Sequence, residues 1–299
     1  MAMTQYNNTG KDVDITDLIT NISPSETPLM SLFGKADAAK GVIHSWEEDK
    51  LRDPAENAKV EGFEYSVDTK DEPRLLDNVC QIFAAGYGVT KTSQAVHRKN
   101  IKNKMAYNMR GAMKEIALDV EYALINNNEK ITGNDATARK LGGLPYFVQT
   151  NVMDNGGTAR ALTWDLINGT IEAVKAAGGS PDHLVVSLRN KRVLSSLLPL
   201  NTTRNADIGN KKIGAVIDVF VSDFGTLNVL PDRWLGNEDV YVLSSEYFGL
   251  SYLRPFKTEE LPNVSDSLKK IIVGELTLEA RAEKASARIT DLNGTVPSA

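Results

Sequence analysis

The strongest constraint on the fold is one long stretch with helical periodicity. Residues 103–127 carry apolar side chains at three- and four-residue spacing, at Met105, Met109, Met113, Ile116, Val120 and Leu124. This period predicts one amphipathic helix, which at about 1.5 Å per residue is on the order of 35 Å long. Three consecutive asparagines, beginning at Asn126, are expected to end it.

A second long stretch has the period of a strand. Residues 268–290 alternate between apolar and polar side chains. One face would carry Ile272, Leu276, Leu278, Ala280 and Ala282, and the other Glu275, Thr277, Glu279, Arg281 and Glu283. We expect one long strand with a buried apolar face and a polar face.

The region 41–95 contains strand-like segments around a highly charged stretch. Between Glu47 and Asp77 there are eleven acidic and five basic residues, a net charge of −6. A stretch this long with so few apolar residues is unusual inside a compact domain, unless it reaches out to something.

The N-terminal residues have the pattern of an arm. Residues 1–11 are polar, and residues 12–22 suggest a short helix that ends before Pro24. Thr27 and Pro28 predict the N-cap and first residue of another short helix, with Gly34 as its stop. Such short pieces cannot form a core alone, so we expect them to lie on another surface.

Residues 160–250 alternate between helical and strand patterns. Thr163 would cap a helix that stops at Gly178 and Gly179. The further expected elements are a strand at 184–187, a helix at 190–198, a loop at 201–212, a hairpin turning at 223–225, and strands at 239–245 and 249–256.

Composition excludes several classes of protein. The chain has 299 residues and 41% hydrophobic residues, which fits one large domain or two fused lobes. The lone Cys80 forms no internal disulfide and is expected to be a buried thiol. No signal peptide or 18-residue apolar run occurs. The net charge of −5 argues against binding nucleic acid through bulk positive charge.

No catalytic motif is convincing. Asp223-Phe224-Gly225 matches the magnesium motif of kinases, but the other kinase motifs are missing, so a hairpin turn is expected. His44, His97 and His183 are far apart in sequence and are interpreted as isolated. Phosphate-binding loops and metal-ligand spacings are absent from the sequence, so we expect no enzyme activity and no cofactor.

One charge pattern suggests contacts between subunits. Residues 96–115 contain six basic residues and one acidic residue, a net charge of +5, which complements the acidic stretch. The candidate contact residues are Glu47, Glu48, Asp49, Arg98, Lys99 and Lys102. The alternative is that both clusters are solvated faces.

Six segments in order carry a family resemblance. They are DITDLITNISPSETPLMSLFGK, IHSWEEDKL, TARKLGGL, VSDFGTLNVLPDRW, SYLRPFKTEEL and TLEARAEKASARITDL. Together they resemble the major capsid proteins of tailed bacteriophages, which have the Hong Kong 97-type fold. The likeness spans about Asp12 to Leu292.

The resemblance implies an α+β fold with a defined layout. Residues 1–36 would be the N-arm and 37–95 the E-loop region. Residues 96–159 and 251–299 would form the peripheral domain, with the spine helix and the long strand, and 160–250 the axial domain. The resemblance also implies a scaffold encoded separately, and no residue indicates a covalent crosslink.

The expected function is self-assembly of a phage head around double-stranded DNA. Partners would be other copies in pentamers and hexamers, the DNA on the inner face, scaffolding and portal proteins, and cement proteins. The protein would belong to the virion and assemble in the host cytoplasm, with no membrane involved. The alternatives are an α/β enzyme, a nucleic-acid-binding module, or an encapsulating shell protein of non-viral type.

Overall fold

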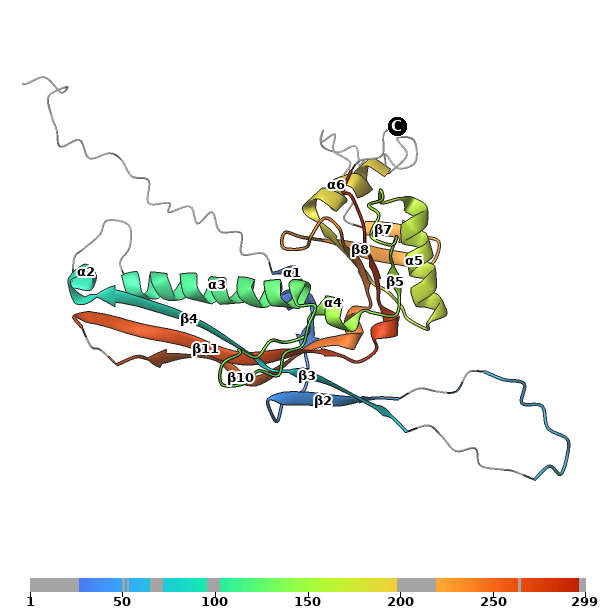
Figure 1. Cartoon of the computed structure of the whole chain (residues 1–299), viewed down its shortest axis with the longest axis horizontal. Helices are drawn as coiled ribbons and strands as arrows, with labels where there is room; N and C mark the ends of the chain where they lie inside the picture. The colour runs from blue at the N-terminus through green and yellow to red at the C-terminus, as the bar shows by residue number, and fades with distance from the viewer. Residues whose placement is uncertain are drawn as a thin grey trace, which may run out of the picture.

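The structure is a computed structural model that describes residues 27–49, 52, 54–64, 72–95, 103–197, 219–262 and 265–295. Three sheets organise it, with a long helix lying along one of them and a hairpin projecting at one end (Figure 1). The predicted helix at residues 12–22, the predicted loop at 201–212, and His97 lie outside the described residues.

The long helix packs on a four-stranded sheet. Helix α3 (Lys104–Asn126) begins at Asn103, whose side chain accepts a hydrogen bond from Ala106 N, so the predicted spine helix is confirmed. The sheet has the order β1 (Gly34–Lys35), β10 (Phe248–Glu260), β11 (Ser267–Ala280), β4 (Gln81–Thr90). All pairs are antiparallel except β1 with β10.

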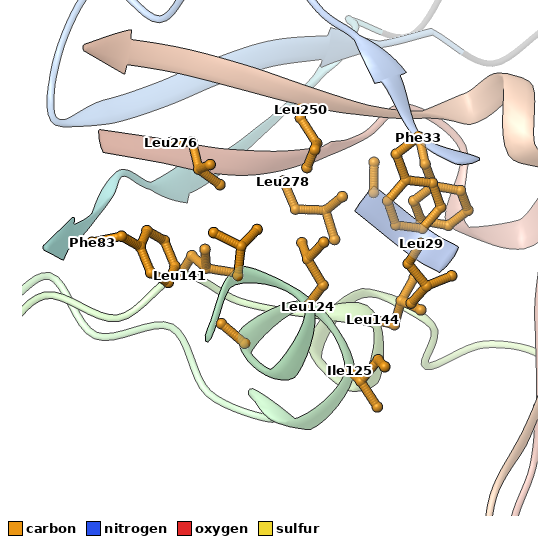
Figure 2. Close-up of a cluster of buried hydrophobic side chains, with 14 of the residues drawn as sticks. Leu29, Phe33, Phe83, Leu124, Ile125, Leu141, Leu144, Leu250, Leu276 and Leu278 are labelled. Carbon is orange, nitrogen blue, oxygen red and sulfur yellow. The ribbon is translucent and has the colours of Figure 1, made fainter. Parts of the chain in front are cut away.

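The core between helix and sheet is apolar and continuous. It contains Ile116, Val120 and Leu124 of α3 and Phe83, Tyr87, Ile272, Leu276 and Leu278 of the sheet. Figure 2 shows Leu29 of α1 (Pro28–Leu32) and Phe33, the residue that follows this helix, closing one end of the cluster near Leu250 and Leu278. Short helices α2 (Lys91–Ala95) and α4 (Leu144–Phe147) flank the spine helix.

A six-stranded sheet forms the second lobe. Its order is β5 (Val152–Met153), β12 (Ala287–Ile289), β9 (Val240–Leu243), β6 (His183–Ser187), β8 (Gly225–Asp232), β7 (Val219–Ser222). Helices α5 (Trp164–Ala176) and α6 (Leu188–Leu197) share its core. Thr163 caps α5 as predicted, and the turn at 223–225 joins β7 to β8.

The predicted long strand is two strands in different sheets. β11 ends at Ala280, a short 3₁₀ helix follows (Glu283–Ala285), and β12 then pairs with β9. The change of sheet lets both Ala287 and Ile289 be fully buried in the second core. The sequence does carry a sign of this break, because the buried apolar residues shift from even positions in β11 to odd positions at Ala287 and Ile289, and the expectation of one strand overlooked this shift.

The polar face of β11 was also predicted incompletely. Glu275, Thr277 and Glu279 are buried, with 5%, 0% and 5% of their surfaces exposed. The hairpin of β2 (Ile43–Glu48) and β3 (Arg74–Val79) contributes to covering this region, since β3 packs against β11. Glu275 and Glu279 therefore face partner groups inside the protein rather than water, whereas the buried Thr277 hydroxyl makes no hydrogen bond within the described residues.

Sheet membership departs from the expected segment boundaries at three strands. β4 was placed in the E-loop region of residues 37–95, but it pairs with β11 in the four-stranded sheet. β5 and β12 fall in the expected peripheral segments, but they belong to the six-stranded sheet. The division into domains at residues 96–159, 160–250 and 251–299 stays a prediction.

Candidate assembly interface

The hairpin β2–β3 forms a two-stranded sheet apart from the other two sheets. Residues 54–64, which we call the distal loop, lie far from the rest of the molecule (Figure 1), and every one of them is exposed. Val60 and Phe63 expose 79% and 46% of their surfaces. An isolated two-stranded hairpin is marginally stable in water, so its position depends on how its base is held.

Asn78 of β3 holds the base of the hairpin from inside the protein. Its side-chain nitrogen donates to the carbonyls of Gly142 (3.0 Å) and Leu278 (2.8 Å). Its side-chain oxygen accepts hydrogen bonds from Gly142 N and Val79 N, both at 2.8 Å. The residue is fully buried, so it joins β3 to β11 and to the loop that follows the spine helix.

The inward face of β2 binds the end of β11. His44 Nε2 lies 2.8 Å from Glu279 Oε2, and Trp46 Nε1 donates to the carbonyl of Ala280 at 2.9 Å. Burial by itself raises the pKa of Glu279, but hydrogen bonds from His44 and Arg281 outweigh it and lower the pKa below its usual value. The sequence suggested that His44 is isolated, whereas the structure pairs it with Glu279.

Two further ion pairs secure the loop of residues 128–143. Glu275 of β11 contacts Arg254 of β10 at 2.6 Å and Arg139 of this loop at 3.3 Å. Lys130 Nζ lies 2.7 Å from Asp77 Oδ1 on β3. The loop therefore links the hairpin to the four-stranded sheet, through Asp77 on β3 and Glu275 on β11.

Cys80 connects β3 to β4 and is buried, as predicted. Burial raises the pKa of its thiol to about 11, and the nearby Glu275 carboxylate adds to this effect. A thiol in this state is neither a nucleophile nor a metal ligand at neutral pH.

The structure describes half of the predicted contact residues. Glu47 and Asp49 are exposed at the outer end of β2, and Glu48 is half-buried opposite Arg74. The basic residues Arg98, Lys99 and Lys102 lie outside the described residues.

Other members of the two charged clusters are separated within the subunit. Lys104, at the start of α3, lies at the opposite end of the molecule from the distal loop (Figure 1). A contact between Lys104 and the distal loop would therefore involve two subunits.

The remaining sequence motifs have structural explanations. Ser222 Oγ accepts from Phe224 N, and Gly225 has a φ of 143°, so the Asp-Phe-Gly sequence forms a tight turn. His183 Nδ1 lies 3.0 Å from Asp182 Oδ1, far from His44 in the other lobe. Across the described ranges, no group of three or more His, Cys, Asp or Glu side chains could hold a metal ion.

Comparison with known proteins decides the family. The model of the SU10 major capsid protein family matches residues 2–293 of this chain. The chain belongs to the SU10 major capsid protein family. The major capsid protein of Escherichia phage Phieco32 is 26% identical over 348 aligned positions, with 97% of each chain covered.

Solved structures show the fold of this SU10-family chain. A chain of the cyanophage A-1(L) capsid asymmetric unit aligns with a TM-score of 0.69 and 12% identity, covering 92% of this chain and 95% of that one. The SrpI encapsulin of Synechococcus elongatus PCC 7942 has a TM-score of 0.60 at 14% identity, covering 93% and 91%. Mycobacterium phage Bobi gives 0.58 at 13%, covering 92% and 93%.

These matches confirm the predicted Hong Kong 97-type α+β fold. The fold alone does not separate a phage capsid from an encapsulin, whereas the SU10 family match does. The predicted function is confirmed: this is a major capsid protein of a tailed phage, and its copies form an icosahedral shell. Among the described residues, no helix is long and apolar enough to span a membrane.

Proposed function

We propose that each subunit joins its neighbour by laying the hairpin β2–β3 and the distal loop over the neighbour's four-stranded sheet. The observation that carries this proposal is the projection of the exposed distal loop away from its own subunit (Figure 1). The hairpin has a base that is fixed to its own subunit and a loop that extends away from it, so the loop can contact a second subunit in one defined orientation. The contact is head-to-tail, and such a contact closes into a ring when the rotation between neighbours divides a full turn evenly, here into pentamers and hexamers.

The receiving surface is the face of the four-stranded sheet opposite α3. On β4, Phe83, Tyr87 and Val89 point into the core, and the alternate residues point outward. The outward residues are Ile82, with 46% of its surface exposed, followed by the small residues Ala84, Gly86 and Gly88. Small side chains leave a flat strip on which an extended segment can lie closely.

Charge fixes the orientation of this contact. The acidic residues Glu47, Glu48 and Asp49 of one subunit face the basic residues Arg98, Lys99 and Lys102 of the next. Each exposed pair contributes only about 0.2–1 kcal/mol, so the pairs set the orientation and register of docking more than its affinity.

Charge reversal tests this contact. Replacing Arg98, Lys99 and Lys102 together by Glu is expected to block assembly or give malformed particles. Adding Glu47→Lys, Glu48→Lys and Asp49→Lys to the same chain restores part of the assembly. Reversal of Asp154, Asp165 and Glu172 to Lys makes the chain more positive by the same amount as the change at Glu47, Glu48 and Asp49, but outside the contact, so it is the control for the rescue. Normal shells from the basic-to-acidic variant over a range of salt would show that both clusters are merely solvated.

The subunit acts by assembly and not by catalysis. The observation behind this part of the proposal is that the buried ionisable groups around β11 are bonded to one another across the fold. A chemical assay of assembled particles for hydrolase activity, with the His44→Gln/His97→Gln/His183→Gln variant alongside, tests it. Activity lost in the variant would contradict it.

The shell is proposed to enclose double-stranded DNA without sequence preference, and to assemble in the host cytoplasm with scaffolding, portal and cement proteins. The net charge of −5 leaves no general attraction for DNA, so packaging must be driven from outside the subunit. Co-expression with and without the phage's other head proteins, followed by particle sizing, tests which of these partners assembly requires.

A further inference from the structure

Two buried carboxyl groups meet where the first helix docks. Glu121 of α3 and Asp232 at the end of β8 are both fully buried. Helix α1 lies against both α3 and β8. The pair therefore sits where the first described helix, the spine helix and the six-stranded sheet come together.

Glu121 performs the capping that the sequence assigned to Thr27. The side chain of Thr27 makes no capping hydrogen bond. Instead, Glu121 Oε1 accepts from Leu29 N at 2.7 Å and Oε2 accepts from Met30 N at 2.8 Å. Both oxygens of one carboxyl group on α3 thus hold the start of α1.

One carboxyl oxygen of Asp232 is buried without a hydrogen-bond donor among the described residues, and a protonated second carboxyl could supply one. Its Oδ1 accepts from Trp234 N at 2.6 Å, while its buried Oδ2 accepts no hydrogen bond from a donor of the described residues. The carboxyl groups of Asp232 and Glu121 are within hydrogen-bonding reach of one another. A hydrogen bond between two carboxyl groups requires a proton on one of them.

No cation compensates for a double negative charge at this place. Neither carboxyl takes part in an ion pair with a basic side chain of the described residues. Helix α1 has no titratable side chain, and β10 meets Phe33 through Phe248. Arg233 lies with its guanidinium over the Trp234 ring, 5.4 Å from the ring centre. On α3 itself, the nearby acids Glu115 and Asp119 are exposed.

We propose that Glu121 and Asp232 share one proton when α1 is docked, and that loss of this proton at alkaline pH loosens α1 from the spine helix. The proton bridges the two carboxyl groups, and the remaining negative charge is held by the backbone N–H groups of Leu29 and Met30. This device goes beyond shell formation, since it makes attachment of the N-terminal segment depend on pH.

The direction of the pH dependence follows from the two states. Burial and, next, the hydrogen bond with Asp232 raise the pKa of Glu121 and outweigh the N–H groups of Leu29 and Met30, which lower it, so the net pKa is about 8 against an ordinary value of 4.5. The docked state therefore holds a proton that the undocked state has lost. Between about pH 4.5 and 8, the equilibrium constant for docking of α1 falls by at most tenfold for each pH unit. Above about pH 8 this constant no longer changes with pH.

Hydrogen exchange on the full chain tests this proposal. The protection of the backbone amides of residues 28–33 is measured by mass spectrometry from pH 5.5 to 9 and corrected for the intrinsic exchange rate at each pH. The wild-type protection is expected to fall up to about tenfold per unit up to pH 8. Peptides from β6, in the other core, are the internal reference.

Three variants decide the outcome. Glu121→Gln keeps the shape and one of the two acceptor oxygens but cannot ionise, so its protection should be lower than that of wild type but independent of pH. Asp232→Asn offers an amide donor to an ionised Glu121, so it should also remove the dependence, and it serves if the first variant does not fold. Glu115→Gln, an exposed change on the same helix, should keep the wild-type profile. The proposal of a shared proton would be overturned if the wild-type protection did not vary with pH. It would also be overturned if Glu121→Gln and Asp232→Asn both kept the pH dependence of wild type.

Discussion

Asn78 and Gly142 are joined by a reciprocal pair of hydrogen bonds, in which Asn78 Nδ2 donates to Gly142 O at 3.0 Å and Gly142 N donates to Asn78 Oδ1 at 2.8 Å. The pair connects the base of the projecting hairpin to the loop that follows the spine helix. An amide side chain is suited to this place, because it carries a donor group and an acceptor group side by side.

Replacing Asn78 by Ala should therefore destabilise the subunit. The change leaves Gly142 N, Gly142 O and Leu278 O without their partner inside the protein. The expected loss is roughly 3 kcal/mol or more, since each of the three buried polar groups costs on the order of 1–3 kcal/mol without a partner. Denaturant unfolding of the unassembled subunit measures it.

The matched control is Asn228→Ala, which removes an exposed asparagine from β8. That change should alter the free energy of unfolding by less than about 0.5 kcal/mol. If the two variants are equally stable, Asn78 does not hold the hairpin.

Acid should weaken attachment of the hairpin to β11. The pKa of Glu279 is lowered in the folded protein, against an ordinary value of 4.5. The stabilisation is therefore present above about pH 4.5 and is lost as the pH falls through the lower folded value. Unfolding free energies measured from pH 7 down to pH 3 should fall more steeply for wild type than for Glu279→Gln. Parallel curves would show that the His44–Glu279 contact does not contribute.

The thiol of Cys80 should be inert in the native protein. With a pKa of about 11, only about one thiol in a thousand is ionised at pH 8, and the side chain is buried. Labelling with a thiol reagent at pH 8 should be at least about a hundredfold slower than in denaturant. Rapid labelling of native particles would mean that the junction between β3 and β4 opens readily.

The distal loop should become ordered by its neighbour. Residues 54–64 are exposed in the subunit, so their amides should exchange fast before assembly and slowly in the shell. Hydrogen exchange on both forms measures this, with α3 as the segment that should be protected in both. Equal exchange of the loop in the two forms would remove it from the interface.

Elements with a local signal could be predicted from the sequence. The spine helix was found from its apolar spacing and its asparagine cap, and α5 from the cap at Thr163. The turn at Gly225 was predictable because a conformation with positive φ favours glycine. Each of these depends on residues close together in the chain.

Elements that depend on distant contacts could not be predicted. The sheet that buries Ala287 is set by the distant pairing of β12 with β9, and only the shift of apolar residues from even to odd positions after Ala280 marks the break locally. Glu121 replaces Thr27 as the cap of α1 across 92 residues of chain. Asn78 carries no local pattern at all. The alternation of Glu275 and Glu279 with apolar residues indicated which face of β11 is polar. It could not indicate their partners His44 and Arg139, which are distant in sequence.

The central claim is that the hairpin β2–β3 of one subunit lies on the four-stranded sheet of the next in a closed shell. Cryo-electron microscopy of the assembled protein, at a resolution that traces the backbone, tests this claim most directly. We predict rings of five and six subunits in which each distal loop crosses the outward face of a neighbour's β4, near Ile82 and Gly86. Uniform small particles, or shells in which the hairpin contacts only its own subunit, would contradict it.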